Sequence, residues 1–298
     1  MNRTAAGGRA ARVLRSGPLT TVQDGGRTGV AALGVPRAGA LDRPAHALAN
    51  RLVGNAPDAA ALETTLGGVA LRALAPLVAA VTGAPSPVRV DGRPAAWGAP
   101  VRLAAGSVLE VGAATDGVRA YVALDGGVAV RPVLGSRSAD LLSGLGPPPL
   151  AQGDVLPLGE PAGPPVRIEP LPLPAPPREL VLRLDPGPRD DWFSPGSLRL
   201  LAASGYTVAA ASNRIGLRLQ GPPLRRAPGR GELPSEGMVL GAVQVPPDGL
   251  PVVFLADHPT TGGYPVIGVV PAADLAAAAQ AAPGISVRFA VTEQQRRR

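Results

Sequence analysis

The chain has 298 residues, a formal net charge of +7 and no cysteine. Every basic residue is an arginine, which excludes a Schiff-base or PLP lysine, a biotin-carrying lysine and a Walker A lysine. The positive charge is scattered and aromatic residues make up only 3% of the chain, so we expect no nucleic-acid binding.

The absence of cysteine also excludes disulfides and a thiolate nucleophile. We find neither an apolar run of about 18 residues nor a signal-like N-terminus. We therefore expect a cytoplasmic protein without a membrane span.

The first half of the chain reads as short strands bounded by Gly, Pro or Asp, with one helix among them. The helix is expected over residues 42–53: Asp42 can cap it, Pro44 suits its first turn, and Gly54 can end it. An Asp91-Gly92 pair predicts a hairpin turn. The strands are expected at residues 77–82, 87–90, 101–103, 107–111, 119–124 and 128–130.

The second half has the same character. Helices are expected over residues 194–203, with Ser194 as the cap, and over residues 272–281. Pro247-Asp248-Gly249 is a turn signal that joins two of the strands into a hairpin. The strands are expected at residues 179–184, 207–210, 216–219, 238–245, 251–256 and 266–270.

Many strands with few helices between them indicate a mainly β fold of antiparallel barrels or sandwiches. The Pro-rich stretch divides the chain. We expect a first β-barrel subdomain at residues 12–160, a linker at 161–178, a second β-barrel subdomain at 179–293 and a basic tail at 294–298.

Two stretches of the first half carry dense polar residues. After a strand and among glycines, Gln23, Asp24 and Arg27 offer an amide, a carboxylate and a forked cation; a solvated ion pair at a turn explains them equally well. Farther along, Arg137 next to Ser138 could cradle a carboxylate or phosphate, although a plain surface turn is the simpler interpretation.

The richest stretch lies in the second half. If the predicted hairpin forms, its ends bring Ser235 and Glu236 toward Asp257, His258 and the turn that follows. Two carboxylates, a histidine, hydroxyls and a phenol would then converge, a set suited to binding a small polar amide or to proton transfer. The other polar residues of this stretch are Gln244, Thr260, Thr261 and Tyr264.

A Ser-His-Asp hydrolase is disfavoured because no Gly-x-Ser-x-Gly elbow occurs and because neighbouring strand residues point to opposite faces. No metal site is expected, since neither histidine has ligand spacing around it. His46 is interpreted as a residue on the helix surface or at the edge of the core.

Ordered motifs along nearly the whole chain resemble the family of the 5-oxoprolinase C subunit (PxpC/KipA, also called allophanate hydrolase subunit 2). They include GPLTTVQD at 17–24, GALD at 39–42, ANRLVGN at 49–55, RAYVA at 119–123, VLGSRS at 133–138, GPRDDWF at 187–193, SNRIGLRL at 212–219, LPSEGM at 233–238 and TTGGYP at 260–265.

The resemblance implies two cyclophilin-like β-barrels, similar to the A–B half of the carboxyltransferase domain of urea carboxylase. It implies a PxpB/KipI-like partner and a PxpA/LamB-YcsF-like partner. Together these would hydrolyse 5-oxo-L-proline to L-glutamate with ATP as the cofactor of the complex, and the chain alone would be inactive.

On this basis Asp24, Glu236 and Asp257 are candidates for proton handling. Arg27, Arg137 and Arg214 are candidates to hold carboxylate or phosphate charge. The chain departs from the family at Arg37-Ala38, where a serine is common, and at His258-Pro259, where Arg-Gln is common, so no catalytic role is assigned to His258.

Two other functions stay open. One is a carboxyltransferase component acting on urea or a similar amide, with biotin carried by another protein. The other is a regulator that binds a KipI-type kinase inhibitor without turnover.

Overall fold

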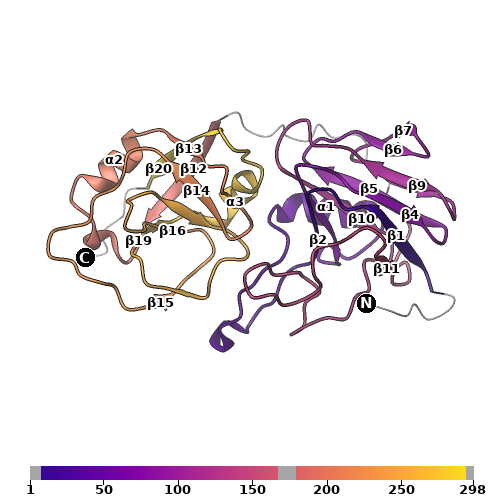
Figure 1. The fold of residues 1–298 in the computed structure, drawn as a ribbon, viewed down its shortest axis with the longest axis horizontal. Helices are drawn as coiled ribbons and strands as arrows, with labels where there is room; N and C mark the ends of the chain where they lie inside the picture. Colours follow the sequence, from indigo (N-terminus) through magenta and orange to yellow (C-terminus); the bar gives the residue numbers. More distant parts are fainter. Residues whose placement is uncertain (1–7, 167–178, 293–298) are drawn as a thin grey trace. The chain divides into compact units, whose positions relative to one another are not determined.

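The computed structural model describes residues 8–166 and 179–292, and these form two compact units. The first unit contains residues 8–27, 38–140 and 144–166; the second contains residues 28–37, 141–143 and 179–292. Figure 1 shows both units, the first from indigo to magenta and the second mainly from orange to yellow. Most of the predicted linker (167–178) and the predicted tail (294–298) lie outside the described residues.

The first unit is built from two antiparallel sheets. The six-stranded sheet runs in the order β11 (Val155–Pro157), β1 (Ala10–Arg15), β4 (Ala70–Ala73), β9 (Val108–Val111), β6 (Val88–Val90) and β7 (Arg93–Ala95). The five-stranded sheet runs in the order β2 (Leu19–Gln23), β3 (Ala61–Thr65), β10 (Arg119–Leu124), β5 (Leu77–Gly83) and β8 (Val101–Leu103).

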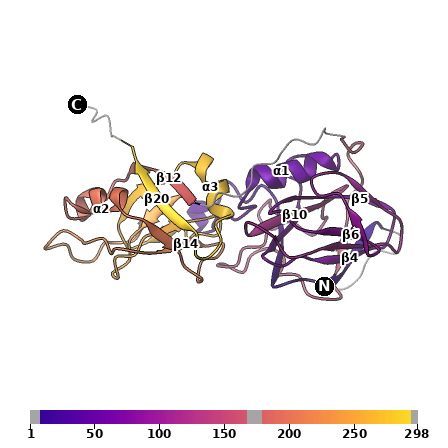
Figure 2. The same cartoon turned by 90° about the horizontal axis from the view of Figure 1, so that it is seen from above.

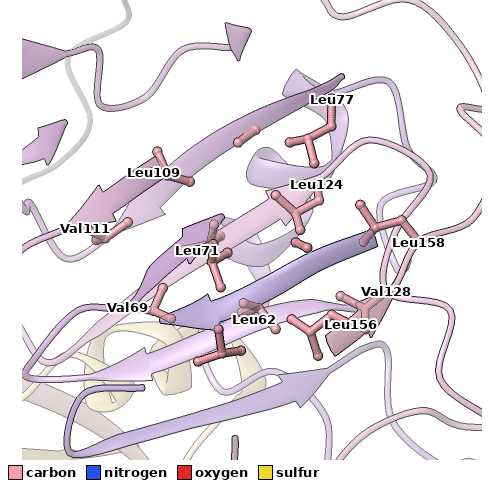
Figure 3. Close-up of a cluster of buried hydrophobic side chains, with 14 of the residues drawn as sticks. Leu62, Val69, Leu71, Leu77, Leu109, Val111, Leu124, Val128, Leu156 and Leu158 are labelled. Atoms are coloured by element: carbon pink, nitrogen blue, oxygen red, sulfur yellow. The ribbon is translucent and has the colours of Figure 1, made fainter. Parts of the chain in front are cut away.

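The main core of the first unit is a cluster of buried aliphatic side chains from both sheets (Figure 3). It includes Leu71 and Leu109 from the six-stranded sheet and Leu62 and Leu124 from the five-stranded sheet. Because side chains alternate along a strand, the residues between these point to the other face of each sheet.

The other face of the five-stranded sheet is buried by helix α1 (Arg43–Leu52), as Figure 2 shows. On β10, Tyr121 and Ala123 pack with Ala49 and Leu52 of the helix, whereas their neighbours join the main core. This explains why β10 is buried at every position and does not alternate between apolar and polar residues.

Helix α1 begins and ends as the sequence predicts. The Asp42 carboxylate accepts a hydrogen bond from the Ala45 N–H at 3.0 Å, and Gly54 follows the helix with a φ of 81°. The predicted hairpin at Asp91-Gly92 also forms: both residues have positive φ, and β6 pairs with β7 across them.

The second unit is a closed seven-stranded barrel in the order β12 (Glu179–Pro186), β19 (Val266–Val269), β16 (Ala242–Gln244), β17 (Val252–Phe254), β14 (Gly216–Gln220), β13 (Tyr206–Val208) and β20 (Ser286–Val291). β16 and β17 form the predicted hairpin, with Val243 opposite Val253. β12 and β20 pair in parallel, the one exception among the barrel's pairs to the expected antiparallel arrangement.

Several predicted boundaries need correction. Helix α2 (Ser197–Ala203) starts three residues late and without Ser194 as its cap, because the Ser194 N–H bonds to the Arg225 carbonyl and holds that segment extended. Helix α3 (Ala272–Ala279) forms largely where expected. Two 3-10 turns, η1 (Ala31–Leu33) and η2 (Asp190–Trp192), complete the helical elements of the described residues.

Two predicted strands do not form as continuous strands. Residues 128–130 contribute only an isolated bridge between Val128 and Leu158. The strand expected at 238–245 is interrupted because the Ala242 N–H bonds back to the Val239 carbonyl, with Gly241 at a φ of 84°. A small separate sheet joins β15 (Glu236–Gly237) to β18 (Thr261–Gly262).

The mainly β fold in two units with a few short helices is thus confirmed. In the described parts of the chain, we find no helix with the length and hydrophobicity needed to span a membrane.

Candidate functional site

The Asp24 carboxylate, directly after β2, is surrounded by four hydrogen-bond donors. The Ser136 and Ser138 hydroxyls donate to Oδ1 at 2.6 Å each, and the Gly26 N–H donates to the same atom at 2.8 Å. The Arg137 N–H donates to Oδ2 at 2.5 Å. The turn at residues 134–140 therefore holds a carboxylate of the chain itself, through two hydroxyls and the Arg137 main-chain N–H. The Arg137 guanidinium, expected to hold the charge, instead donates to the Val130 carbonyl at 2.8 Å.

These contacts set the charge of Asp24. Burial alone would raise the pKa of this carboxyl, but the hydrogen bonds from Ser136, Ser138, Arg137 and Gly26 together outweigh burial and lower the pKa below its usual 3.8. An ionised carboxylate with four donors is a firm anchor for the turn and a weak proton acceptor. Its predicted role in proton handling stays a prediction.

Arg27 and Gln23 are buried next to this anchor, so they are not the solvated turn residues of the alternative interpretation. The Arg27 guanidinium donates to the carbonyl oxygens of Val133 at 3.2 Å and of Ser138 at 2.5 Å. The Gln23 amide nitrogen donates to the Ala139 carbonyl at 3.0 Å. Both side chains thus hold the segment 133–139 against β2.

Of the two interpretations of His46, the helix surface is wrong: the residue is buried, with 3% of its surface exposed, and it lines a hollow at the edge of the core. Its Nε2 is 3.1 Å from the Gln23 carbonyl oxygen, and the Asn50 amide lies 3.4 Å from the same nitrogen. A carbonyl oxygen only accepts hydrogen bonds, so Nε2 carries the proton. Burial lowers the pKa of His46, which favours the neutral ring.

A buried polar network between the five-stranded sheet and the main chain at residues 41 and 42 fixes the start of α1. The Tyr121 hydroxyl donates to Glu63 Oε2 at 2.8 Å, and the Asp42 N–H donates to that hydroxyl at 2.7 Å. The Leu41 N–H donates to the same Glu63 oxygen at 3.0 Å. These contacts order the segment that leads into the helix.

An open hollow of about 360 Å³ lies between this segment, helix α1 from Arg43 to Arg51 and the Asp24 turn. Its floor includes the buried residues Asp24, Ala40 and His46. The remaining lining residues are Gly25, Arg43, Pro44, Ala47, Arg51, Pro57 and Asp58. The volume falls within the range of small-molecule sites.

In the second unit, Asp257 and Arg214 form a buried ion pair. Arg214 Nε donates to Asp257 Oδ2 and Arg214 Nη2 donates to Asp257 Oδ1, both at 2.9 Å. The Asp257 side chain is 0% exposed and the Arg214 side chain 1%. The Leu141 N–H adds a donor to Oδ2 at 3.3 Å. The predicted anion-binding arginine is therefore bound to the predicted proton-handling carboxylate.

Asp257 and His258 lie in a turn after β17 and not on a strand, so strand alternation does not decide where their side chains point. The His258 N–H bonds back to the Leu255 carbonyl. Its Nδ1 is 2.7 Å from the Pro259 carbonyl oxygen, and its ring stacks on Phe254 at 6.1 Å. Both polar residues are buried beside the barrel end.

The remaining candidates of the second unit gather at the small β15–β18 sheet. Glu236 lies opposite Gly262 and Gly237 opposite Thr261, and the Met238 N–H donates to the Thr260 carbonyl. Ser235 lies next to Gly263, because a Cβ placed on that glycine would be 3.9 Å from the Ser235 Oγ.

Two arginines that the sequence did not single out contact this group. Arg189 donates to both carboxylate oxygens of Glu236, at 2.7 to 3.3 Å. Arg226 lies over the Tyr264 ring at 6.0 Å. The Gln244 amide donates to the Tyr264 carbonyl at 3.2 Å. Arg189 and Glu236 are 47 residues apart, so no local pattern could reveal their pairing.

The predicted site residues thus form two groups, one in each unit. Gln23, Asp24, Arg27, Arg137 and Ser138 come together in the first unit. The second unit brings together two sets: Arg214 with Asp257, and Ser235, Glu236, Gln244, Thr260, Thr261 and Tyr264 around the small sheet. In the described ranges, no cluster of three or more His, Asp or Glu residues could hold a metal ion.

This fold is that of carboxyltransferase domains. The urea carboxylase of Kluyveromyces lactis superposes with a TM-score of 0.88 at 32% identity, over 96% of this chain and 28% of that one. The chain belongs to the family of the carboxyltransferase domain, subdomain A and B, whose model matches residues 33–291.

Two further relatives are similar over nearly all of this chain. The C subunit of the Escherichia coli 5-oxoprolinase is 38% identical over 285 residues, which cover 93% of this chain and 90% of the relative. The crystal structure of TTHA0988 has a TM-score of 0.86 and 40% identity, over 97% of this chain and 57% of that one. The chain thus spans little more than half the length of that solved protein.

Proposed function

We propose that the chain is a subunit of an ATP-dependent 5-oxoprolinase complex that hydrolyses 5-oxo-L-proline to L-glutamate. The observation that carries this proposal is the 38% identity to the C subunit of a 5-oxoprolinase over 90% of that relative's length. ATP and a nucleotide site belong to the complex, since a chain without lysine has no Walker A lysine.

The geometry supports a chain that works with partner subunits, such as PxpB/KipI-like and PxpA/LamB-YcsF-like proteins. The carboxylates of Asp24, Asp257 and Glu236 are each engaged by donors of the chain itself. A general base must be able to take a proton from the reacting group. Asp24 and Asp257, which are buried, therefore serve first to shape the site. The partly exposed Glu236 stays the candidate for proton transfer, and partner subunits supply further groups. We place the complex in the cytoplasm.

The experiment is a reconstitution. The purified chain is mixed with candidate A and B subunits, 5-oxo-L-proline and ATP, and glutamate is followed over time. We expect glutamate only when all three proteins and ATP are present. A complete mixture without glutamate would contradict the proposal, and so would equal activity when this chain is left out.

A second candidate is favoured by the structural match to urea carboxylase at a TM-score of 0.88. In this role the chain would act on urea or a similar small amide, with carboxybiotin on a separate carrier protein. The same preparation, supplied with a biotin carboxylase, a biotinylated carrier, bicarbonate and urea, would then consume ATP in a urea-dependent manner. ATP consumption with 5-oxo-L-proline but not with urea decides for the first candidate. Binding of a KipI-like protein without either activity would point to the regulator.

A further inference from the structure

The hollow beside α1 has a wall of two arginines with a small residue between them. Arg43, Ala47 and Arg51 are spaced four residues apart, so they share one face of the helix, and all three line the hollow. Within the described residues, neither guanidinium is paired with a carboxylate of the chain. Because a guanidinium binds carboxylates through charge-assisted hydrogen bonds, these two are suited to an anion from outside.

The carboxylates of the hollow form no ion pair with Arg43 or Arg51 within the described residues. Asp24 already accepts four hydrogen bonds, from Ser136, Ser138, Gly26 and Arg137. Asp58 is exposed and forms no ion pair within the described residues. Two guanidiniums and two carboxylates thus line the hollow without pairing, which leaves both guanidiniums available to the carboxylate of a ligand.

The floor of the hollow offers a hydrogen-bond acceptor as well. His46 has only 3% of its surface exposed yet lines the hollow, and its Nε2 is engaged by the Gln23 carbonyl. In the neutral ring the other nitrogen, Nδ1, carries a lone pair. Nδ1 has no partner among the described residues, so a ligand N–H or O–H can donate to it.

The floor is also rigid. The Ala40 N–H donates to the Asp24 carbonyl at 3.0 Å, and a Cβ at Gly39 would lie only 2.9 Å from the Gly26 nitrogen. The segment before α1 is therefore packed against the Asp24 turn with no room between them. A preformed floor reduces the entropy lost when a small ligand binds.

We propose that this hollow binds a small organic carboxylate that also carries an N–H donor, with the carboxylate at Arg43 and Arg51 and the N–H at His46 Nδ1. Resting on the proposed function, we identify the ligand as 5-oxo-L-proline, which has one carboxylate and one lactam N–H on a five-membered ring. Urea lacks the carboxylate, so the two arginines would distinguish the two substrates.

Binding is tested by calorimetry on the whole purified chain with three probes. 5-Oxo-L-proline has both groups, pyrrolidin-2-one lacks the carboxylate, and 5-oxotetrahydrofuran-2-carboxylate replaces the N–H with a ring oxygen. We expect 5-oxo-L-proline to bind and each of the other two to bind at least about tenfold more weakly, because each loses a charge-assisted or otherwise buried hydrogen bond. No heat with 5-oxo-L-proline, or equal affinity for pyrrolidin-2-one, overturns the proposal.

Variants locate the binding in this hollow. Arg43→Gln and Arg51→Gln are each expected to weaken 5-oxo-L-proline about tenfold while leaving pyrrolidin-2-one unchanged. Arg102→Gln, an exposed arginine on β8, is the matched control and keeps wild-type affinity. Unchanged affinity in the Arg43→Gln/Arg51→Gln double variant rules the hollow out. The lactone probe tests His46 without mutating this buried residue.

The result separates from that of the reconstitution. If the complex forms glutamate but Arg43→Gln/Arg51→Gln does not change its KM for 5-oxo-L-proline, the proposed function is supported and the proposed site is contradicted. Binding with the expected probe order, but no glutamate from the complex, keeps the carboxylate site and sinks the proposed function.

Discussion

The Asp24 carboxylate accepts a 2.6 Å hydrogen bond from the Ser138 hydroxyl, although the two residues are 114 positions apart in the chain. The Asp24 N–H in turn donates to the same hydroxyl at 2.9 Å. Ser138 thus closes a ring with both the main chain and the side chain of Asp24, which joins the end of β2 to the 134–140 turn.

Asp24→Asn should destabilise the first unit. The introduced amide group would place donors where Ser136, Ser138 or Arg137 now donate, so at least one buried donor would lose its partner. We expect a loss of about 2 to 4 kcal/mol in the free energy of unfolding, measured by urea denaturation. The matched control is Asp116→Asn, an exposed aspartate whose Oδ1 accepts one local N–H that an asparagine can keep. A wild-type midpoint for Asp24→Asn would contradict the anchoring role.

The same carboxylate predicts a pH dependence. The pKa of Asp24 is lower in the folded protein than its ordinary value of 3.8, so the folded state favours the charged form. Its stabilising contribution is therefore complete well above pH 3.8 and is lost as the pH falls through the lower folded value. We expect the stability difference between wild type and Asp24→Asn to be constant at neutral pH and to shrink below pH 3.8. A difference that grows on acidification would show that the sign is wrong.

Replacing one partner of the buried Arg214–Asp257 pair should destabilise the protein strongly, whereas replacing both partners together should destabilise it less. Removing one partner with Asp257→Asn leaves a buried guanidinium without its counter-charge, which typically costs about 3 to 5 kcal/mol. The double variant Arg214→Met/Asp257→Leu should recover part of that loss, because it leaves no buried charge. Thermal denaturation of wild type, Arg214→Met, Asp257→Leu and the double variant completes the cycle.

The control for this pair is Glu179→Gln, which removes an ion pair to Arg288 whose side chains are 42% and 56% exposed. Its unfolding midpoint should not change measurably. Equal effects of Asp257→Asn and Glu179→Gln would refute the structural role of the buried pair.

Gly146 permits the close approach between Arg27 and the 134–140 turn. It has a φ of 84°, and a Cβ there would clash with the Ser138 carbonyl oxygen and lie 2.9 Å from Arg27 Nη2. Gly144, in the same loop, has a φ of 71° with nothing within 4 Å of its Cβ position. Alanine at either position costs about 1 kcal/mol for the left-handed backbone, but only Gly146→Ala adds a clash of about 1 to 3 kcal/mol. Equal unfolding midpoints for the two variants would argue against this tight packing.

Glu236 is the predicted catalytic carboxylate that remains partly exposed, with a side chain 25% accessible and paired to Arg189. In a reconstituted complex, we expect Glu236→Gln to lower glutamate formation at least about a hundredfold with little change in the unfolding midpoint, as for a group that transfers a proton. Arg189→Gln should have a smaller effect, since it removes only the partner that orients the carboxylate. Full activity of Glu236→Gln would remove this residue from the catalytic set.

Local sequence signals predicted the elements whose cause is local. Helix α1 begins at Asp42, which caps it with a hydrogen bond to Ala45, and ends before Gly54, which has a left-handed backbone. The turn at Asp91-Gly92 forms because both residues have positive φ angles. Residues 238–245 show the limit of such signals. The apolar run favours one long strand, but a turn at Gly241 divides it, and the partners of each piece are set by pairing with distant strands.

Composition and short-range backbone preferences are enough to specify the mainly β class, the hairpin turns, the helix around residues 43–52 and the exclusion of lysine and cysteine chemistry. The ordered motifs also carry the family resemblance. Only the tertiary structure shows which charged side chains already have partners within the chain. Asp24 meets Ser136 and Ser138, Asp257 meets Arg214, and Arg43 and Arg51 line a hollow beside a buried His46. The first two pairings join residues more than 40 positions apart, and the electrostatics of a site depend on distance in space and not on spacing in the chain.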